Sequence, residues 1–292
     1  MSTTEEAAPR FDGIETWPTP DLAQTLLETQ LAAAAAALET RDLLAQAIDA
    51  AAERLAKGGR LIYLGAGTSG RLAVLDAAEL LPTFDWPVER AVALMAGGEG
   101  AVLHAVEGAE DNADAARDAL EGLAPGAADV VIGVAASGRT PFTLAGLALA
   151  RAQGALTIGI FNAAPAPMAD QVDIALHART GAEIIAGSTR MKAGTAQKIL
   201  LNCLSTGVMI RLGHVYRGRM VNMRPTNAKL ARRAIRMVAD LTGEPLERAQ
   251  EALDSAGTVK AAVLMLALGI PAKEAHKRLD ATGGVLARAL GR

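Results

Sequence analysis

The residues best suited to chemistry follow a short apolar run, Leu61–Leu64, in the segment RLIYLGAGTSGR at 60–71. After the apolar run come three glycines, two hydroxyl side chains and a cation: Gly65, Gly67, Gly70, Thr68, Ser69 and Arg71. From Leu72 the apolar residues recur with helical spacing. Glycines let a ligand approach the backbone, and the first N–H groups of a helix attract anions. We therefore expect a strand, a tight turn and a helix start that bind a phosphate or sugar phosphate.

Two other interpretations fit the same glycines. Their spacing matches the dinucleotide fingerprint G-x-G-x-x-G, which also needs an acidic residue at the end of the second strand. The expected second strand, 91–95, instead runs into Gly97 and Gly98, and Glu99 follows only after them. A simple strand-to-helix turn needs fewer glycines and no hydroxyls. The order of preference is sugar phosphate, dinucleotide, plain turn.

A second loop of the same kind follows the strand expected at 129–134. It reads AASGRTP at 135–141, and it offers the hydroxyls of Ser137 and Thr140 and the cation of Arg139. Either hydroxyl could simply cap the next helix. Two such loops in one sheet favour a ligand, and a dinucleotide site does not require the second.

A third helix start, GSTRMK at 187–192, again combines hydroxyls with cations. Ser188 is a candidate sugar contact, and Lys192 is a candidate cation for the same ligand. Helix capping explains this segment equally well.

Two glutamates are candidates for proton transfer. Glu79 lies in an apolar helix that ends Leu80-Leu81-Pro82, and a carboxylate among leucines tends to keep its proton, as a general acid must. Glu110 lies in a polar stretch, EGAED at 107–111. From the residues alone, a solvated acid is the better interpretation for either one.

Composition narrows the class of protein. The 292 residues carry a net charge of −3, which provides no general attraction to nucleic acid or acidic lipid. The N-terminus has no signal-like apolar segment, and no stretch is apolar enough to span a membrane. The single cysteine, Cys203, lies in an apolar run and is expected to be buried, and its solitude fits a reducing cytoplasm. The four histidines have no metal-ligand spacing.

The pattern along the chain predicts two helices first, at about 22–38 and 41–56, with Thr19 as a cap. Strands then alternate with helices. Strands are expected at 60–64, 91–95, 129–134, 155–160 and 172–176, and helical stretches at 69–80, 99–121, 140–152 and 190–212. This alternation predicts an α/β fold with a five-stranded parallel sheet flanked by helices on both faces. The ligands of such sheets bind at the carboxyl ends of the strands.

The C-terminal part has a different character. A basic segment begins at Arg217 and includes Arg224, Lys229 and Arg236. Without interleaved aromatic residues, this segment indicates a solvated face or a few phosphate contacts rather than a nucleic-acid site. Three short helices are expected at 244–255, 258–268 and 273–280. We expect an N-terminal arm with helices at 1–57, a sugar-phosphate-binding domain at 58–236 and a small helical bundle at 237–292.

Taken together, these motifs resemble the N-acetylmuramic acid 6-phosphate etherase family, whose members carry a sugar isomerase (SIS) domain. The resemblance covers about 58–292. It rests on GAGTSGR at 65–71, LDAAE at 75–79, AGG at 96–98, HAVEGAEDN at 104–112, AASGRTP at 135–141 and GAEIIAGSTRMKAGTAQK at 181–198.

The resemblance implies a cytoplasmic lyase of peptidoglycan recycling, a role in amino sugar metabolism. The reaction joins water to N-acetylmuramic acid 6-phosphate and yields N-acetylglucosamine 6-phosphate and D-lactate. It implies Glu79 as the catalytic acid and Glu110 as the second catalytic carboxylate. It further implies no metal or organic cofactor, no nucleic-acid or membrane partner, and a homodimer with sites near the interface.

Some positions depart from the family pattern. The family usually has Thr-Glu-x-x-Asn near its start, whereas here Thr4-Glu5 is followed by Ala8 at the asparagine position. Leu80-Leu81-Pro82 also replaces the usual Cys-Pro-Pro. The alternative function is a non-catalytic sugar-phosphate sensor that regulates a partner, as in the related glucokinase regulatory protein. The presence of both Glu79 and Glu110 favours the enzyme.

Overall fold

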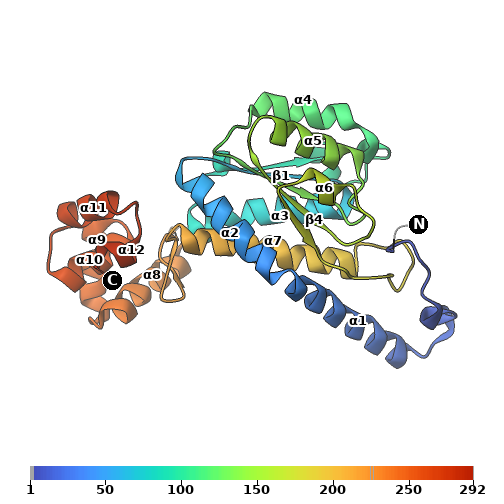
Figure 1. The fold of residues 1–292 in the computed structure, drawn as a ribbon. Helices are drawn as coiled ribbons and strands as arrows, with labels where there is room; N and C mark the ends of the chain where they lie inside the picture. The colour runs from blue at the N-terminus through green and yellow to red at the C-terminus, as the bar shows by residue number, and fades with distance from the viewer. Residues whose placement is uncertain (1–2, 224, 226, 292) are drawn as a thin grey trace. The chain divides into compact units, whose positions relative to one another are not determined.

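A five-stranded parallel sheet with strand order β2-β1-β3-β4-β5 forms the centre of the computed structural model, which describes residues 3–223, 225 and 227–291 (Figure 1). Its strands are β1 (Leu61–Gly65), β2 (Ala91–Met95), β3 (Val130–Val134), β4 (Leu156–Phe161) and β5 (Ile174–His177). Every residue of β1, β3 and β4 is buried, as expected for parallel strands covered on both faces. The predicted parallel sheet is confirmed.

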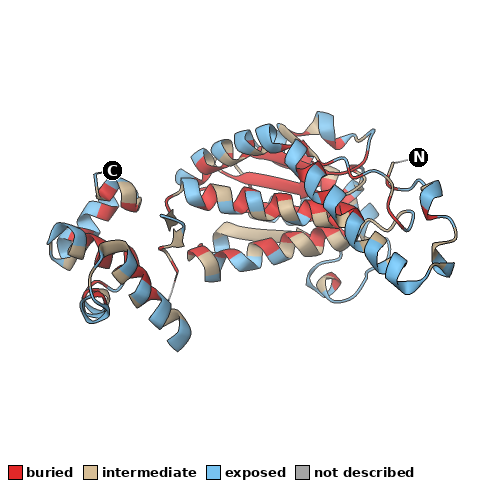
Figure 2. Ribbon diagram, turned by 90° about the horizontal axis from the view of Figure 1, so that it is seen from below, coloured by how far each residue is buried: buried red, intermediate tan, exposed pale blue. Residues whose placement is uncertain are grey.

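Helices cover both faces of the sheet. One face carries α4 (Ala113–Leu123) and α5 (Pro141–Ala152), and the other carries α2 (Arg41–Ala56), α3 (Gly67–Phe84) and α7 (Lys192–Arg211). The other helical segments here are α1 (Thr19–Glu39), α6 (Met168–Gln171) and the 3-10 turns Pro9–Phe11, Ile14–Thr16, Val88–Arg90, Glu99–Val102 and Ala109–Asp111. Figure 2 shows the buried residues concentrated in the strands and in the helix surfaces that face them.

The chain forms two compact units, one from the described residues of 1–78 and 88–206, the other from those of 79–87 and 207–292. The second unit contains a short hairpin, β6 (Val215–Tyr216) with β7 (Arg219–Met220), and five helices: α8 (Ala228–Thr242), α9 (Leu246–Ala256), α10 (Val259–Leu268), α11 (Ala272–Ala281) and α12 (Leu286–Ala289). The boundary expected at 236/237 falls inside α8. Ala234, Met237 and Val238 of α8 pack in one core with residues of α9 and α10. The helix therefore has an apolar, buried side in addition to its basic surface.

Two helix predictions need correction. The helix that begins after β1 was expected to end before Pro82, but α3 contains this proline and continues to Phe84. A proline in the last turn removes only one backbone hydrogen bond, and Leu80 and Phe84 are both buried one turn apart. The helical stretch expected at 99–121 is two 3-10 turns followed by α4, because glycines interrupt it.

Other details also differ from expectation. Thr19 is the first residue of α1 rather than its cap, and Cys203 is exposed rather than buried. A short helix, α12, follows the three helices that were expected in the C-terminal bundle. Arg224 of the basic segment lies outside the described residues. None of the helices in the described part of the chain combines the length and hydropathy that a bilayer crossing requires.

A buried carboxylate joins a strand to two helices. Asp76 of α3 has 3% of its surface exposed. It accepts hydrogen bonds from the Tyr63 hydroxyl (2.9 Å), the Asn202 amide (2.6 Å) and the Ser205 hydroxyl (3.1 Å). Burial, and then the negative charge of Asp76, raise the pKa of Tyr63 well above its ordinary value, so this hydroxyl remains a donor. Asp76 thereby fixes α3 against β1 and α7.

Replacing Asp76 by alanine should destabilise the protein, because the buried hydroxyls of Tyr63 and Ser205 and the partly buried amide of Asn202 would lose this acceptor. We expect Asp76→Ala to lower the free energy of unfolding by about 3 kcal/mol in urea denaturation. Asp118→Ala, at an exposed position of α4, is the matched control and should change it by less than about 0.5 kcal/mol. Equal stability of the two variants would contradict the role given to Asp76.

Candidate functional site

The predicted phosphate loops lie where the strand order of the sheet reverses. The chain passes from β1 to β2 on one side and then to β3 on the other. Gly65 at the end of β1 therefore lies in register with Val134 at the end of β3. Ligands of open parallel sheets bind outside the strand ends at such a position. The loops that follow β1 and β3 are neighbours at this point.

The first loop depends on close contact between two glycines. A Cβ on Gly65 would lie 2.8 Å from backbone atoms of Gly70, and a Cβ on Gly70 would lie 2.7 Å from the carbonyl oxygen of Gly65. Both distances are shorter than real Cβ contacts, so no larger residue fits without movement. These glycines allow α3 to begin directly against the end of β1, and this packing requires them whether or not a ligand binds.

The hydroxyl of Ser69 is engaged inside the protein. Ser69 is 7% exposed and donates to Oε1 of Gln197 on α7 (2.9 Å). Nε2 of Gln197 donates to Asn162 (2.9 Å), whose amide donates to the carbonyl of Ala178 (3.0 Å). Ser69 thus positions the loop, and its single hydroxyl hydrogen is already used. Thr68 next to it is only half-buried.

A cavity of 170 Å³ brings the first loop together with one of the predicted acids. Gly67, Arg71 and Glu110 all line it, as do Glu107 and Met95. Arg71 is held at this position because its Nε and Nη2 donate to the carbonyls of Val102 and Ala101, both at 2.9 Å. A helix start, a fixed cation and a carboxylate therefore face one small cavity, which can hold an anion beside a proton acceptor.

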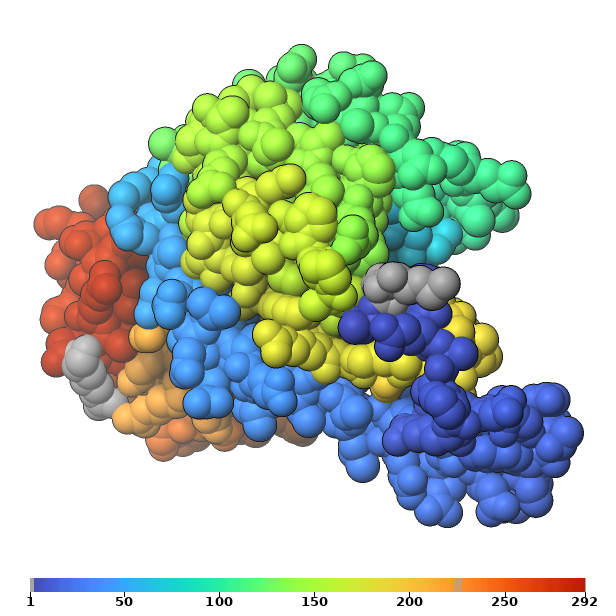
Figure 3. Space-filling view, turned by 45° about the vertical axis from the view of Figure 1, so that its right-hand side comes forward, coloured from blue at the N-terminus to red at the C-terminus, as the bar shows by residue number. Residues whose placement is uncertain are grey.

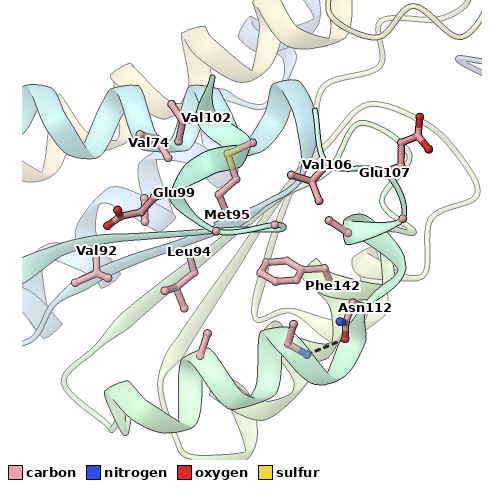
Figure 4. Close-up of a pocket in the computed structure, with 17 residues that line it drawn as sticks. Val74, Val92, Leu94, Met95, Glu99, Val102, Val106, Glu107, Asn112 and Phe142 are labelled. Carbon is pink, nitrogen blue, oxygen red and sulfur yellow. Dashed lines mark hydrogen bonds between the residues drawn. The ribbon is translucent and has the colours of Figure 1, made fainter. Parts of the chain in front are cut away.

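A larger pocket of 940 Å³ adjoins this cavity, since Met95 and Val106 line both. The wall of this pocket is largely apolar and includes Val92, Leu94 and Phe142 (Figure 4). The polar residues Glu99, Glu107 and Asn112 line other parts of it. The dashed line in the figure is the cap of α4, in which the Asn112 side chain accepts from Ala115 N. An apolar wall does not suit a phosphate group, so this larger pocket is a poor phosphate site.

The second loop presents hydroxyl groups that do not cap a helix. Thr140 is the N-cap residue of α5, yet its side chain makes no capping hydrogen bond. Ser137 Oγ accepts from the backbone N–H of Arg139 (3.2 Å), which leaves its hydrogen to be donated to a ligand. The Arg139 side chain is exposed and donates to the carbonyl of Pro165. This loop fits a phosphate better than the capping interpretation does.

The start of α7 already holds an anion of the protein itself. The buried carboxylate of Glu183 accepts from the backbone N–H groups of Lys192 (3.1 Å) and Ala193 (2.9 Å). The Lys192 ammonium, itself buried, donates to the carbonyls of Thr180 (2.9 Å) and Ala182. Burial lowers the pKa of Lys192, although the charge of Glu183 opposes that shift. Lys192 therefore ties down the preceding loop, and the half-buried Ser188 lies within that loop's final turn.

The N-terminal arm contacts the same loop. Thr4 is fully buried, and its carbonyl accepts from the N–H of Gly187 (3.0 Å). Figure 3 shows the dark blue arm against the yellow segment. Of the arm residues that bear on the family pattern, Thr4 is therefore the buried one, whereas Glu5 is exposed and Ala8 is half-buried.

The structure brings Gly67, Arg71 and Glu110 together and places Glu79 elsewhere. Glu79 lies about three turns after the start of α3, is exposed, and belongs to the second unit. Sequence reasoning assigned no task to Glu183 or Gln197, although both lie in the 181–198 motif, because a motif does not show which partners the fold gives its residues. In the described part of the chain, no cluster of three or more His, Cys, Asp or Glu side chains could hold a metal ion.

Comparison with known proteins identifies close relatives. The chain is 49% identical to an N-acetylmuramic acid 6-phosphate etherase from Deinococcus radiodurans, over 99% of this chain and 95% of that protein. It is 47% identical to one from Lactobacillus gasseri, over 99% and 98%. The N-terminal SIS domain model of glucokinase regulatory protein matches residues 43–151, and the SIS domain model matches 113–206.

Solved structures show the same fold. A phosphoheptose isomerase from Francisella tularensis superposes with a TM-score of 0.51 at 18% identity, over 66% of this chain and 98% of that one. This likeness concerns the SIS fold alone.

The second loop generates a direct test. Ser137→Ala should weaken the binding of a hexose 6-phosphate by about 1–3 kcal/mol, the range for losing a hydrogen bond to a charged group. Isothermal titration calorimetry would measure this, with the exposed Ser255→Ala of α9 as the matched control. Unchanged affinity in Ser137→Ala would remove Ser137 from the site.

Proposed function

This chain belongs to the N-acetylmuramic acid 6-phosphate etherase family, and we propose that it converts N-acetylmuramic acid 6-phosphate and water into N-acetylglucosamine 6-phosphate and D-lactate. The observation that carries this proposal is an identity of 47–49% along 99% of the chain to relatives of that name. The single cysteine fits a cytoplasmic site for the reaction.

The substrate dictates the kind of chemistry. The ether at carbon 3 is not activated, and the alkoxide of lactate is a poor leaving group. In the open-chain sugar, the aldehyde at carbon 1 acidifies the proton on carbon 2. A base removes that proton, an acid protonates the ether oxygen, and the bond from carbon 3 to this oxygen breaks. The resulting unsaturated aldehyde adds water at carbon 3 and regains a proton at carbon 2.

We assign the phosphate to the neighbouring loops after β1 and β3. The hydroxyl of Thr140 does not cap α5, and the hydroxyl of Ser137 only accepts a hydrogen bond, so both can donate to a phosphate. Arg139 adds positive charge, and Thr68 lies at the start of α3. Ser69 and Lys192 keep a place in the site as positioning residues, because both are bonded inside the protein. Ser188 remains a candidate sugar contact.

Two carboxylates take the opposite proton-transfer roles. Glu110 is exposed and lines the 170 Å³ cavity, and we assign it the role of the base. We assign Glu79 the role of the acid, and this residue is exposed in one chain.

A second copy of the chain would change the surroundings of Glu79. Leu75, one turn before Glu79 on the same side of α3, is 44% exposed, which leaves an exposed apolar face beside this acid. Covering this face in a homodimer would remove water from Glu79 and favour its protonated form. The proposed active enzyme is therefore a dimer with its sites near the interface, and Glu79 belongs to the covered face.

Isotopes test the reaction and its route together. The purified protein should release D-lactate from N-acetylmuramic acid 6-phosphate. In deuterated water, mass spectrometry should find deuterium at carbon 2 of the product, and labelled water should place its oxygen at carbon 3. Product without deuterium at carbon 2 would exclude elimination and addition. Tight substrate binding without any lactate would instead support the regulatory alternative.

The acid role of Glu79 is tested by a variant. Glu79→Gln should slow lactate release by about 10²–10⁴-fold, the usual contribution of a general acid, with little change in substrate affinity. Light scattering should give twice the mass of one chain for both proteins. Glu89→Gln, at an exposed position outside α3, is the control. Equal rates for Glu79→Gln and the control would end the assignment.

A further inference from the structure

The second unit carries a strongly basic pocket that the proposed reaction does not use. The pocket has a volume of 450 Å³, and five cations and one acid line it: Arg219, Lys229, Arg232, Arg233, Arg236 and Asp240. Four of the cations stand on α8 at spacings of three and four residues, which places them on one side of the helix. None of the lining residues belongs to the loops after β1 and β3.

Positive charge dominates this pocket. Among the described residues that line it, Asp240 is the one acid, and it forms an ion pair with Arg219 at 3.0 Å. Lys229, Arg232, Arg233 and Arg236 are all exposed, so their charged groups are accessible. The chain as a whole carries a net charge of −3, and this pocket is therefore opposite in sign to the molecule.

The arrangement is unfavourable for α8 in the absence of an anion. Like charges three or four residues apart on a helix repel each other, and Lys229 with Arg232 and Arg233 repeats this unfavourable pairing. Lys229 also lies in the first turn, where the helix dipole disfavours a cation. A bound anion would remove both costs at once.

We propose that this pocket binds a compact anion that carries two or more phosphate groups. Guanidinium groups donate in pairs to phosphate oxygens, and three arginines of α8 face one concave space. The cations from Lys229 to Arg236 extend over about 10 Å of helix, at 1.5 Å per residue. That length suits a diphosphate or triphosphate better than a nucleic-acid strand, and the pocket lining has no aromatic residue on which bases could stack.

Calorimetric titration of the full chain with inorganic pyrophosphate tests the proposal. The double variant Arg232→Gln/Arg236→Gln should bind pyrophosphate at least about tenfold more weakly, since it loses hydrogen bonds to a charged group. Arg248→Gln/Arg278→Gln is the matched control, because both of these arginines are exposed in the same unit outside the pocket. Glutamine has nearly the helix propensity of arginine, so the melting temperature of the double variant should not fall.

Several results would overturn the proposal. These are pyrophosphate binding that is no tighter than monophosphate binding, and equal affinity in the double variant and its control. Tighter binding of a single-stranded twelve-nucleotide DNA, lost in the same double variant, would overturn the choice of a compact ligand. Because the readout is binding, failure of lactate release would leave this inference standing, and its own failure would leave the etherase activity untouched.

Discussion

The burial of one carboxylate constrains how the first unit is assembled. A buried charge is tolerated only where donors surround it, and Asp76 obtains them from Tyr63 on β1 and from Asn202 and Ser205 on α7. Satisfying Asp76 therefore requires β1, α3 and α7 to take up one relative position. The helix that begins at the first loop and the helix that begins at the 181–198 motif are fixed to the same strand by this cluster.

The geometry of the first loop follows from that constraint. With α3 fixed against β1, the turn between them has so little space that only glycine fits at Gly65 and Gly70. Ser69 then falls within reach of Gln197, and the hydrogen-bond chain continues to Asn162 beyond β4. A sequence motif that resembles a ligand contact is thus partly a packing motif, and the cavity beside it is shaped by the packing.

The helices of this protein differ in which side chains accept hydrogen bonds from their first backbone N–H groups. At α7 the carboxylate of Glu183 caps the first N–H groups, so this start has its anion within the chain. At α5 the Thr140 side chain provides no such cap. At α8 the Asn227 side chain caps the backbone, but the cations that follow have no acid of their own apart from Asp240. These differences determine at which helices an external anion would make favourable interactions.

The amino-acid sequence by itself determined the parallel sheet, the two loops at its strand ends and the family. Glycine spacing, buried apolar runs and hydroxyl-rich turns are local patterns that survive without the fold. The tertiary structure alone decided which hydroxyls remain available, since Ser69 meets Gln197 from 128 positions further along the chain. It also showed that Lys192 donates to the carbonyls of the loop before α7, while Glu183 of the same loop accepts from the first N–H groups of that helix. Glu79 proved to be exposed in one chain. Partners brought together only by folding leave no periodic trace in the sequence, and for that reason these roles could not be read from it.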